Sequence, residues 1–524
     1  MDGMSNRKNN IGLLAFWLFI FTTYVYFISL GWPNLAAMDQ NVQRYELTRS
    51  IVEKQELSIP SNIEGTKGID GKDYSLYGLG LPILAVPFYL VGKVFGRSPE
   101  IVASFVSLLN PFVGAATVAV VFLFSTALGY TKRASFIVAI FYGLGTFAWP
   151  LAKQPFDHTV ETFFVLLSVY SMVLYTINNK LKCIIISAVF FGIAVNTRLV
   201  SVLAFPSLLI LMSSNRGTHI NFSESRNKYI LSIMVFIAAL LPFASIVLLY
   251  NLIRFGSMFE TGFQLYSIKT GTEFFSGTSL VNGLYGFLLS PGKGFFYYSP
   301  ITLLYFFALI PFYKKQKVIA LSFSILIMSY IIFHSKLFYW HGDWAWGPRY
   351  LLAITPYFVL PIGEILDFDR WQKKTLKINY FIYPLIVLSI LIQVTAVSVH
   401  FYKNFFHLNI DKKIQFIRTE VKGVPTINQP PFYVYSDWAL SPIIAQFQYV
   451  EEIGSQMKNY RYVEQSTDTI WEKKIKLHPI MNLYDFWWIY MYYVKRNYFG
   501  FIGLLICMLI VCIAGLRIKK MLHI

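Results

Sequence analysis

Apolar residues along this chain form long runs instead of alternating with polar ones. A bilayer-spanning helix needs about 20 such residues. Runs near that length, some of them short, lie at 11–32, 100–129, 134–151, 158–177, 183–197, 199–213, 229–251, 297–313, 318–334, 348–365, 379–400 and 497–516. Because helices satisfy their own backbone hydrogen bonds in lipid, we expect an all-α polytopic membrane protein with about twelve transmembrane helices.

Composition and charge agree with this pattern. Hydrophobic residues make up 56% of the chain and charged residues only 14%, against about 25% charged in soluble domains. The net charge of +18 follows from topology: with the N-terminus inside, seven short inner segments hold 19 Lys and Arg, as the positive-inside rule requires. We therefore predict a plasma (inner) membrane protein with cytoplasmic N- and C-termini and no nucleic-acid partner. The three cysteines, all in apolar runs, have no metal-binding spacing.

Two polar segments, 33–99 and 401–496, fall on the outer side. We predict a transmembrane module at 1–400, whose first outer loop is 33–99, an extracytoplasmic segment at 401–496, and a final helix with a cytoplasmic tail at 497–524. Residues 42–57 have apolar positions at helical spacing, which predicts an amphipathic helix on the outer surface. Residues 76–95 are apolar, but counting them as a crossing would reverse the charge pattern, so we expect a juxtamembrane segment.

Ionisable residues recur at the outer ends of the predicted spans, where such groups are functional candidates. Asp39 follows the first span and could also be a solvated or helix-capping residue. Lys72 lies beside glycine in a turn-like stretch. For Asp157 and His158, at the start of a span, we expect helix capping, with metal or acceptor binding as alternatives. Arg198 needs an anionic partner, either a lipid phosphate or a carboxylate from another helix.

Two later stretches add candidates. Lys293 lies in a Pro-Gly-Lys-Gly break that resembles an anion-binding turn, with a simple loop as the alternative. Residues 338–350 place His341, Asp343 and Arg349 among aromatic residues. An interfacial belt accounts for the rings, whereas the ionisable groups favour a site that stacks on sugars. Because all these junctions face one compartment, they predict a substrate-binding site at the outer membrane–water boundary.

In order and sidedness, these features resemble the membrane-embedded glycosyltransferases of the C-type fold. The nearest are the phospholipid-carrier-dependent enzymes, which include dolichyl-phosphate-mannose protein mannosyltransferases and the aminoarabinose transferases acting on lipid A. The resemblance covers most of 11–365. It rests on Met38-Asp39-Gln40, the amphipathic outer helix, Pro82 and Pro87, Phe156-Asp157-His158, and the Gly-Pro-Arg-Tyr stretch at 347–350. Residues 401–496 have no counterpart in it.

The resemblance implies that Asp39 is the catalytic base and that basic residues of the outer loops bind the carrier phosphate. Candidates for that binding are Lys72, Arg198, Lys293 and Arg349. Many members carry a second acid where this chain has Gln40. The implied reaction is inverting transfer of a hexosyl or pentosyl group from a polyprenyl-phosphate carrier to an extracytoplasmic glycan, lipid or protein.

The implied chemistry requires no cofactor, although some relatives of the fold use a divalent metal. An O-antigen-type polymerase or ligase is an alternative, and it would depend on basic and His residues of the late loops instead of Asp39. A transporter is a further alternative, which would need polar groups near the bilayer midplane.

Overall fold

The computed structural model describes residues 2–31, 39–215, 219–220, 226–270, 275, 278–342, 345–366, 376–400, 403–404, 420–421, 424–425, 433–457 and 482–523. The description covers the backbone only for residues 2–9, 39–41, 214–215, 219–220, 226, 270, 376–381, 420–421, 424–425 and 433–434.

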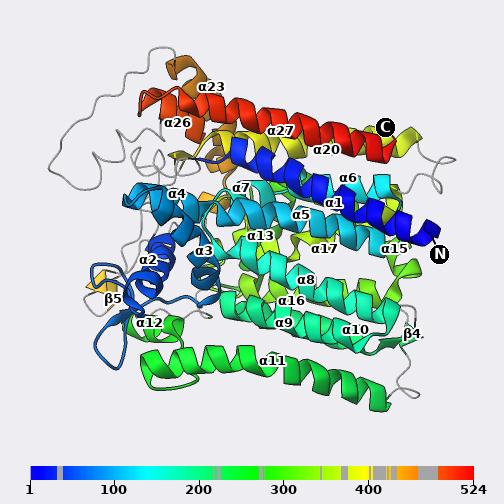
Figure 1. The fold of residues 1–524 in the computed structure, drawn as a ribbon, viewed down its shortest axis with the longest axis horizontal. Coiled ribbons are helices and arrows are strands. Elements are labelled where there is room, and N and C mark those ends of the chain that lie inside the picture. Colours follow the sequence, from blue (N-terminus) through cyan, green and yellow to red (C-terminus); the bar gives the residue numbers. More distant parts are fainter. Residues whose placement is uncertain are drawn as a thin grey trace.

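Long helices run side by side through the molecule, and both chain ends lie at the same end of this bundle (Figure 1). They arise because apolar runs leave the backbone no hydrogen-bond partner in lipid except the helix itself. The long helices are α1 (Asp2–Ile28), α5 (Leu109–Ala127), α6 (Lys132–Gly145), α8 (Asp157–Asn178), α9 (Leu181–Thr197), α11 (Arg226–Phe255), α15 (Leu304–Lys315), α16 (Lys317–Ser335), α20 (Leu376–Ser398) and α27 (Phe499–Leu522).

Several spans are assembled from short helical pieces. Proline is tolerated at the start of such a piece because it has no backbone N–H to donate, and Pro300, Pro356 and Pro361 each lie at the first or second position of theirs. The pieces are α4 (Pro99–Ser107), α7 (Ala148–Ala152), η2 (Leu199–Ala204), α10 (Phe205–Met212), α14 (Phe295–Tyr298), η3 (Pro300–Leu303), η4 (Arg349–Ile354), α17 (Thr355–Val359), η5 (Leu360–Ile362) and α18 (Gly363–Leu366).

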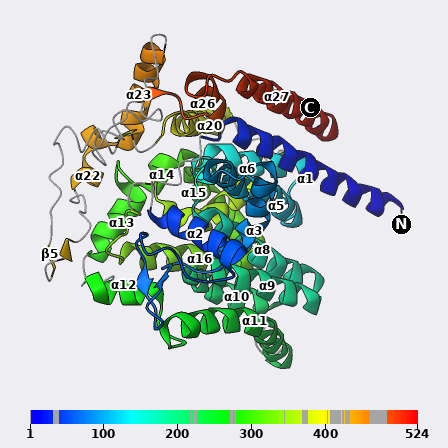
Figure 2. The ribbon, with the colours of Figure 1, turned by 60° about the vertical axis from the view of Figure 1, so that its left-hand side comes forward.

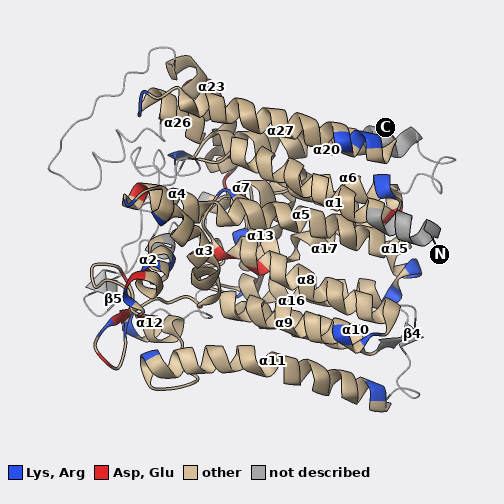
Figure 3. Ribbon diagram, in the orientation of Figure 1, with Lys and Arg blue, Asp and Glu red and all other residues tan. Residues whose placement is uncertain are grey.

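Every predicted span coincides with one or more of these helices. In the part of the chain that is described, seven helices are long and apolar enough to cross a membrane, and five further apolar helices are shorter. The predicted fold class, an all-α polytopic membrane protein, is confirmed. Charged residues at the end of the bundle that holds both termini are nearly all basic, whereas the opposite end mixes acids and bases (Figure 3).

The opposite end, which the charge pattern predicts to be outside and which is called the outer end below, carries most of the short elements. They are α2 (Asp39–Lys54), β1 (Thr66–Lys67), β2 (Asp73–Tyr74), α3 (Gly80–Phe95), α12 (Gly262–Thr270), α13 (Leu280–Leu289), β5 (Glu420–Val421), β6 (Val424–Pro425), α22 (Tyr433–Ser436), η6 (Trp438–Leu440), α23 (Pro442–Gln456) and α26 (Trp487–Tyr493). A further strand pair, β3 (Ser214–Asn215) and β4 (His219–Ile220), joins α10 to α11.

The first outer loop folds as a helix, a hairpin and a second helix. Helix α2 falls on the predicted amphipathic segment and α3 on the predicted juxtamembrane one. Strands β1 and β2 pair antiparallel, with Thr66 opposite Tyr74. Figure 2, which turns the outer end forward, shows α2 in front of the bundle with α12 and α23 near its rim.

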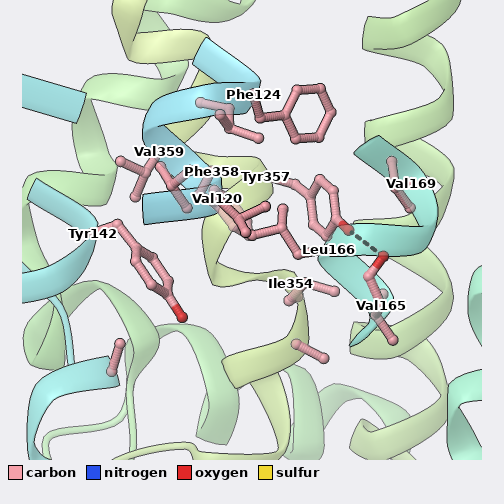
Figure 4. Packing of buried hydrophobic residues seen from close by; sticks show 14 of the residues in the cluster. Val120, Phe124, Tyr142, Val165, Leu166, Val169, Ile354, Tyr357, Phe358 and Val359 are labelled. Carbon is pink, nitrogen blue, oxygen red and sulfur yellow. Dashed lines mark hydrogen bonds between the residues drawn. The ribbon is translucent and has the colours of Figure 1, made fainter. Parts of the chain in front are cut away.

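Aromatic packing holds α8 inside the bundle. Phe124 of α5, Leu166 of α8 and Tyr357 of α17 are fully buried together, and the Tyr357 hydroxyl donates to the Val165 carbonyl at 3.3 Å (Figure 4). Because lipid is as apolar as these side chains, close van der Waals packing, rather than the hydrophobic effect, makes this core stable. This core fixes the position of α8 and therefore of the residues at its outer end.

The segment at 401–496, called the late outer segment below, contacts the bundle through residues 485–488. The Asp485 carboxylate lies 2.8 Å from the Lys153 amine, and both side chains are buried. The indole N–H groups of Trp487 and Trp488 donate to the last carbonyls of α1, at 2.8 and 3.1 Å. This strap, residues 485–488, therefore joins the end of α1 to the loop that precedes α8.

Candidate functional site

The loop before α8 is held from one side by Asn110. Its side-chain amide donates to the backbone carbonyls of Gln154 and Phe156. Helix α8 begins directly after this loop, at Asp157. The capping role that we expected here is wrong, because Phe156 occupies the cap position and no side chain makes the capping hydrogen bond. The Asp157 carboxylate interacts with other helices.

Its principal partner is Arg44 of α2. The guanidinium donates to the Asp157 carboxylate at 2.7 Å, and each side chain is only 4% exposed. The same guanidinium lies 3.9 Å from the ring centre of Tyr77. A charge-assisted hydrogen bond in buried surroundings is strong, so α2, which begins at Asp39, is held against the start of α8.

Arg198 lies at the break between α9 and η2 and joins the same cluster. Its Nε is 3.3 Å from Glu161, and its terminal nitrogen is 3.9 Å from Asp157. Of the two partners foreseen for Arg198, the described structure contains the carboxylates of another helix. Glu161 also accepts hydrogen bonds from the hydroxyls of Tyr330, at 3.0 Å, and Ser201, at 3.2 Å.

Tyr350 lies among the ionisable groups of this cluster. The rings of His158 and His334 have their centres 5.5 and 5.2 Å from the Tyr350 ring. The guanidiniums of Arg198 and Arg349 are 5.4 and 5.3 Å from the same ring centre. Tyr350 is therefore the shared contact of three predicted site residues, His158, Arg198 and Arg349.

The turn that holds Lys293 supports the Arg349 loop. The Lys293 amine is buried and donates to the carbonyls of Ala345, at 2.6 Å, and Gly347, at 3.3 Å. Arg349 follows two residues later and places its guanidinium 4.6 Å from the Phe156 ring, next to Asp157. The His341 ring stacks on Tyr435 of the late outer segment, with ring centres 4.8 Å apart.

The other predicted residues lie apart from this cluster or outside the description. Lys72 is half exposed on the first-loop hairpin, where its amine is 3.2 Å from Glu56. Asp39 is the first residue of α2, but its side chain lies outside the described structure. Asp343 also lies outside the described residues. The structure thus brings together Asp157, His158, Arg198 and Arg349.

Arg44, Tyr330 and His334 belong to the cluster, although the sequence patterns above do not select them. His334 carries the clearest signal, since an ionisable residue inside a predicted span is a functional candidate. Arg44 is one of several charges on an amphipathic helix, and Tyr330 is one of many aromatic residues in apolar runs. Their importance follows from their partners, which only the folded chain reveals.

The described part of the cluster contains three guanidiniums, on Arg44, Arg198 and Arg349, and two carboxylates, on Asp157 and Glu161. This excess of positive charge suits an anion such as a phosphate. Both carboxylates are turned toward arginines. Within the described ranges, no group of three or more His, Cys, Asp or Glu residues is arranged to hold a metal ion.

No protein-family model matches the chain, and no curated protein matches it. Among solved structures, it is similar to ArnT from Cupriavidus metallidurans bound to undecaprenyl phosphate, at 15% identity and a TM-score of 0.48. That similarity covers 94% of this chain and 77% of ArnT.

It is also similar to the oligosaccharyltransferase AglB from Archaeoglobus fulgidus in complex with an inhibitory peptide and a dolichol-phosphate. The identity is 10%, the TM-score is 0.43, and the coverage is 94% of this chain but 64% of AglB. An oligosaccharyltransferase from the same organism in complex with zinc and sulfate gives 11% identity, a TM-score of 0.42, and coverage of 80% and 58%. This chain thus spans less than two thirds of the oligosaccharyltransferases. The resemblance read from the sequence includes the aminoarabinose transferases, and ArnT, one of the similar solved structures, is an enzyme of that kind.

Proposed function

We propose that this chain is an inverting glycosyltransferase that moves a hexosyl or pentosyl group from a polyprenyl-phosphate carrier to an acceptor outside the cytoplasm. The observation that carries the proposal is the cluster of arginines from α2, the α9–η2 break and η4, gathered at the start of α8. Charged groups buried at the ends of membrane-spanning helices are expensive and mark functional sites. The family resemblance of the sequence implies the same sugar transfer from a polyprenyl-phosphate carrier.

Guanidinium groups suit a sugar-phosphate lipid because their planar donors match phosphate oxygens in pairs. Arg44 is committed to Asp157 and almost fully buried. The Arg198 side chain is 15% exposed, which makes it the more accessible of the two. We therefore assign the carrier phosphate to Arg198. Arg349 is only 2% exposed, but its guanidinium lies beside the same Tyr350 ring and the resemblance also makes it a candidate, so we include it in the assignment. Lys293 supports the loop of Arg349 from behind and acts as a positioning residue.

The reaction follows from these placements and from the role that the resemblance assigns to Asp39. Asp39 accepts the proton of the acceptor hydroxyl as its oxygen attacks the anomeric carbon. The new carbon–oxygen bond forms opposite the bond to phosphate, which breaks, so the configuration inverts. The phosphate leaves with the electron pair, and the arginines offset its charge. A divalent metal could add to that neutralisation, and transfer measured with and without a chelator tests for one.

The decisive experiment replaces Asp39 by Asn and by Ala and measures transfer from a radiolabelled polyprenyl-phosphate sugar in membranes. Loss of a general base lowers the rate by about 10²–10⁴-fold, and we expect losses of that order in both variants. Asp70→Asn is the matched control, because Asp70 is an exposed acid on the hairpin of the same outer loop. Near-wild-type transfer by both Asp39 variants would discard the base assignment.

The proposal also fixes an orientation, with the site and residues 401–496 outside, both termini in the cytoplasm, and 1–400 as the catalytic module. Cysteines introduced at Asp70 and Trp438, both exposed at the outer end, should react with an impermeant thiol reagent in intact cells. A cysteine at Thr131, exposed at the other end, should react only after lysis. The reverse pattern, in a background free of native cysteines, would overturn the topology.

A further inference from the structure

The late outer segment contacts the bundle at a second place, through residues 435–441. The Tyr435 carbonyl accepts a hydrogen bond from the Gly292 amide at 2.9 Å. The Ser441 hydroxyl donates to the Pro291 carbonyl at 3.0 Å. Tyr435 is 6% exposed and Ser441 is 1% exposed, so both hydrogen bonds are shielded from water. Both of them end on the Pro-Gly-Lys-Gly turn that the sequence singles out.

Two backbone segments approach so closely at Gly292 that a side chain would not fit. A Cβ atom at this position would lie 2.7 Å from the Cα atom of Tyr435 and 3.0 Å from its carbonyl oxygen. Both of these atoms belong to the backbone, so they cannot turn aside as the end of a flexible side chain can. Glycine permits such a close approach. Gly292 therefore serves the contact with the late outer segment.

The Tyr435 side chain contacts the loop that carries Arg349. Its ring stacks on His341, with ring centres 4.8 Å apart and an angle of 19° between the ring planes. The ring of Trp340 meets it edge-on, at 5.4 Å. Stacked and edge-on arrangements are the geometries that aromatic pairs prefer. Tyr435 therefore joins the turn, through its backbone, to the start of the Arg349 loop, through its ring.

The Pro-Gly-Lys-Gly turn is also joined to the Arg349 loop directly. The Lys293 amine donates to two carbonyls of that loop, as described above. The Tyr298 hydroxyl donates to the Gly292 carbonyl at 2.8 Å, and the Tyr298 ring lies edge-on to Trp346, with ring centres 4.8 Å apart. The side chains that make these contacts are buried. A shift of the turn would therefore displace the loop and, with it, the Arg349 guanidinium.

The late outer segment also contacts the other side of the site. Its strap, residues 485–488, pairs with Lys153, which lies four residues before Asp157 in the chain. The Arg349 guanidinium reaches that side too, since it is 4.6 Å from the ring of Phe156. The late outer segment therefore contacts both loops that supply the cluster, and its two contacts can fix how these loops lie relative to each other.

We infer that the late outer segment positions the arginine cluster for the carrier phosphate, and that it does so through Tyr435, which sets the place of Arg349. The inference rests on the proposed function. It assigns a role in that site to a segment without a counterpart in the family that the sequence resembles. Tyr435 acts through other residues, which makes it a positioning residue. A misplacement of about 1 Å can lower the rate of an enzyme by about 100-fold, so the effect of such a contact is measurable.

The binding test measures the affinity of the full-length protein in lipid nanodiscs for decaprenyl phosphate, a polyprenyl phosphate without a sugar. Tyr435→Ala removes the stacked ring, and we expect the dissociation constant to rise about tenfold, equivalent to about 1.4 kcal/mol. Tyr435→Phe keeps the ring and the backbone contact and should restore wild-type affinity. The control Phe447→Ala removes a ring of the same segment from α23, where Phe447 is 41% exposed, and should bind as the wild type does.

A double variant separates positioning from a general loss of stability. In an Arg349→Met background, Tyr435→Ala should cause no further rise in the dissociation constant, because the residue through which it acts is gone. Gly292→Ala pushes the two backbones apart from the side of the turn and should raise the dissociation constant as Tyr435→Ala does. Additive effects of Tyr435→Ala and Arg349→Met overturn the inference, and so does wild-type affinity in both Tyr435→Ala and Gly292→Ala.

Hydrogen–deuterium exchange tests the positioning role without any ligand. In Tyr435→Ala and Gly292→Ala, the amides of residues 345–354 should exchange about tenfold faster than in the wild type, because local opening of that loop becomes easier. Phe447→Ala should leave their exchange unchanged. Unchanged exchange in both Tyr435→Ala and Gly292→Ala overturns the inference, as does an equal acceleration throughout the bundle. If the wild type binds no decaprenyl phosphate, the proposed carrier site is refuted, while exchange still decides whether the late outer segment positions the loop.

Discussion

Removing the charge of Asp157 tests whether the buried ion pairs, rather than shape alone, hold the candidate site together. Asp157→Asn keeps the size of the side chain and removes its negative charge. It leaves the Arg44 guanidinium without its carboxylate partner at a position where both side chains are 4% exposed. Breaking a buried ion pair by removing one partner costs about 3–5 kcal/mol, and we expect a loss of unfolding free energy in that range.

The control is an ion pair of the same kind at the surface. Lys495 and Glu100 lie 3.4 Å apart, and their side chains are 42% and 66% exposed. Exposed pairs contribute at most about 1 kcal/mol, so Glu100→Gln should change the stability by no more than that. A second comparison adds Arg44→Met to Asp157→Asn. Because the double variant leaves neither charge of this pair behind, its cost should fall below the sum of the single costs by up to about 3 kcal/mol.

Unfolding by sodium dodecyl sulfate in mixed micelles, followed by tryptophan fluorescence, measures these free energies. Glu161 still neutralises Arg198 in the Asp157→Asn variant, at 3.3 Å, so the variant should remain folded before denaturant is added. The reasoning is refuted if Asp157→Asn costs no more than Glu100→Gln. Strict additivity of the two single substitutions would refute it as well.

Three further outcomes follow from other parts of the structure. Hydrogen bonds from Lys93, Tyr89 and Arg49 lower the pKa of the Glu53 carboxyl from 4.5 to about 2. The contribution of the ionised Glu53 to stability is therefore complete above pH 4.5 and is lost as the pH falls toward 2. The difference in melting temperature between the wild type and Glu53→Gln should shrink over that interval. Asp485→Asn leaves the buried Lys153 amine without its carboxylate and should lower the free energy of unfolding by about 3–5 kcal/mol. The loss should appear as faster proteolysis of the late outer segment. The double variant Lys153→Met/Asp485→Asn, which removes both charges, should show no such change. Gly347→Ala combines a positive φ of 61° with a contact of 2.9 Å to Tyr298 and should lower transfer activity, while Gly129→Ala, with φ of 91° and no neighbour within 4 Å, should affect stability alone.

The helices and their order could be predicted because they depend on properties that run along the chain. The length of an apolar run decides whether a helix spans the bilayer, and the positions of Lys and Arg decide how the spans alternate. The segment at 76–95 is apolar enough to be mistaken for a span, and only the second signal leads to its prediction as a juxtamembrane segment; in the structure it holds the 16-residue helix α3.

The pairing of charges could not be predicted, because it depends on which helices meet. Arg44 and Asp157 are 113 residues apart, and Glu161 and Tyr330 are 169 residues apart. An Asp at a helix start can satisfy either the nearby backbone N–H groups or a cation from elsewhere, and sequence alone favours the first. In the fold, Asp157 pairs with a cation from elsewhere, Arg44. Lys72 shows the same limit, since a glycine-flanked lysine is equally compatible with an anion site and with the hairpin where it pairs with Glu56.

The contacts of Glu161 and Asp157 also bear on which carboxylate can act as a base. A general base needs a lone pair that reaches the proton of the acceptor. One oxygen of Glu161 accepts from Tyr330 and Ser201 and the other faces Arg198, while the side chain is 1% exposed. Asp157 is bonded to Arg44 and flanked by His158 and Arg198. Glu161 is thus fully occupied by its three partners. Asp157 keeps one oxygen that accepts no hydrogen bond from the described residues, although the side chain is 4% exposed and faces Arg44 and Arg198. The base that we propose is Asp39, at the start of the helix that Arg44 holds in place.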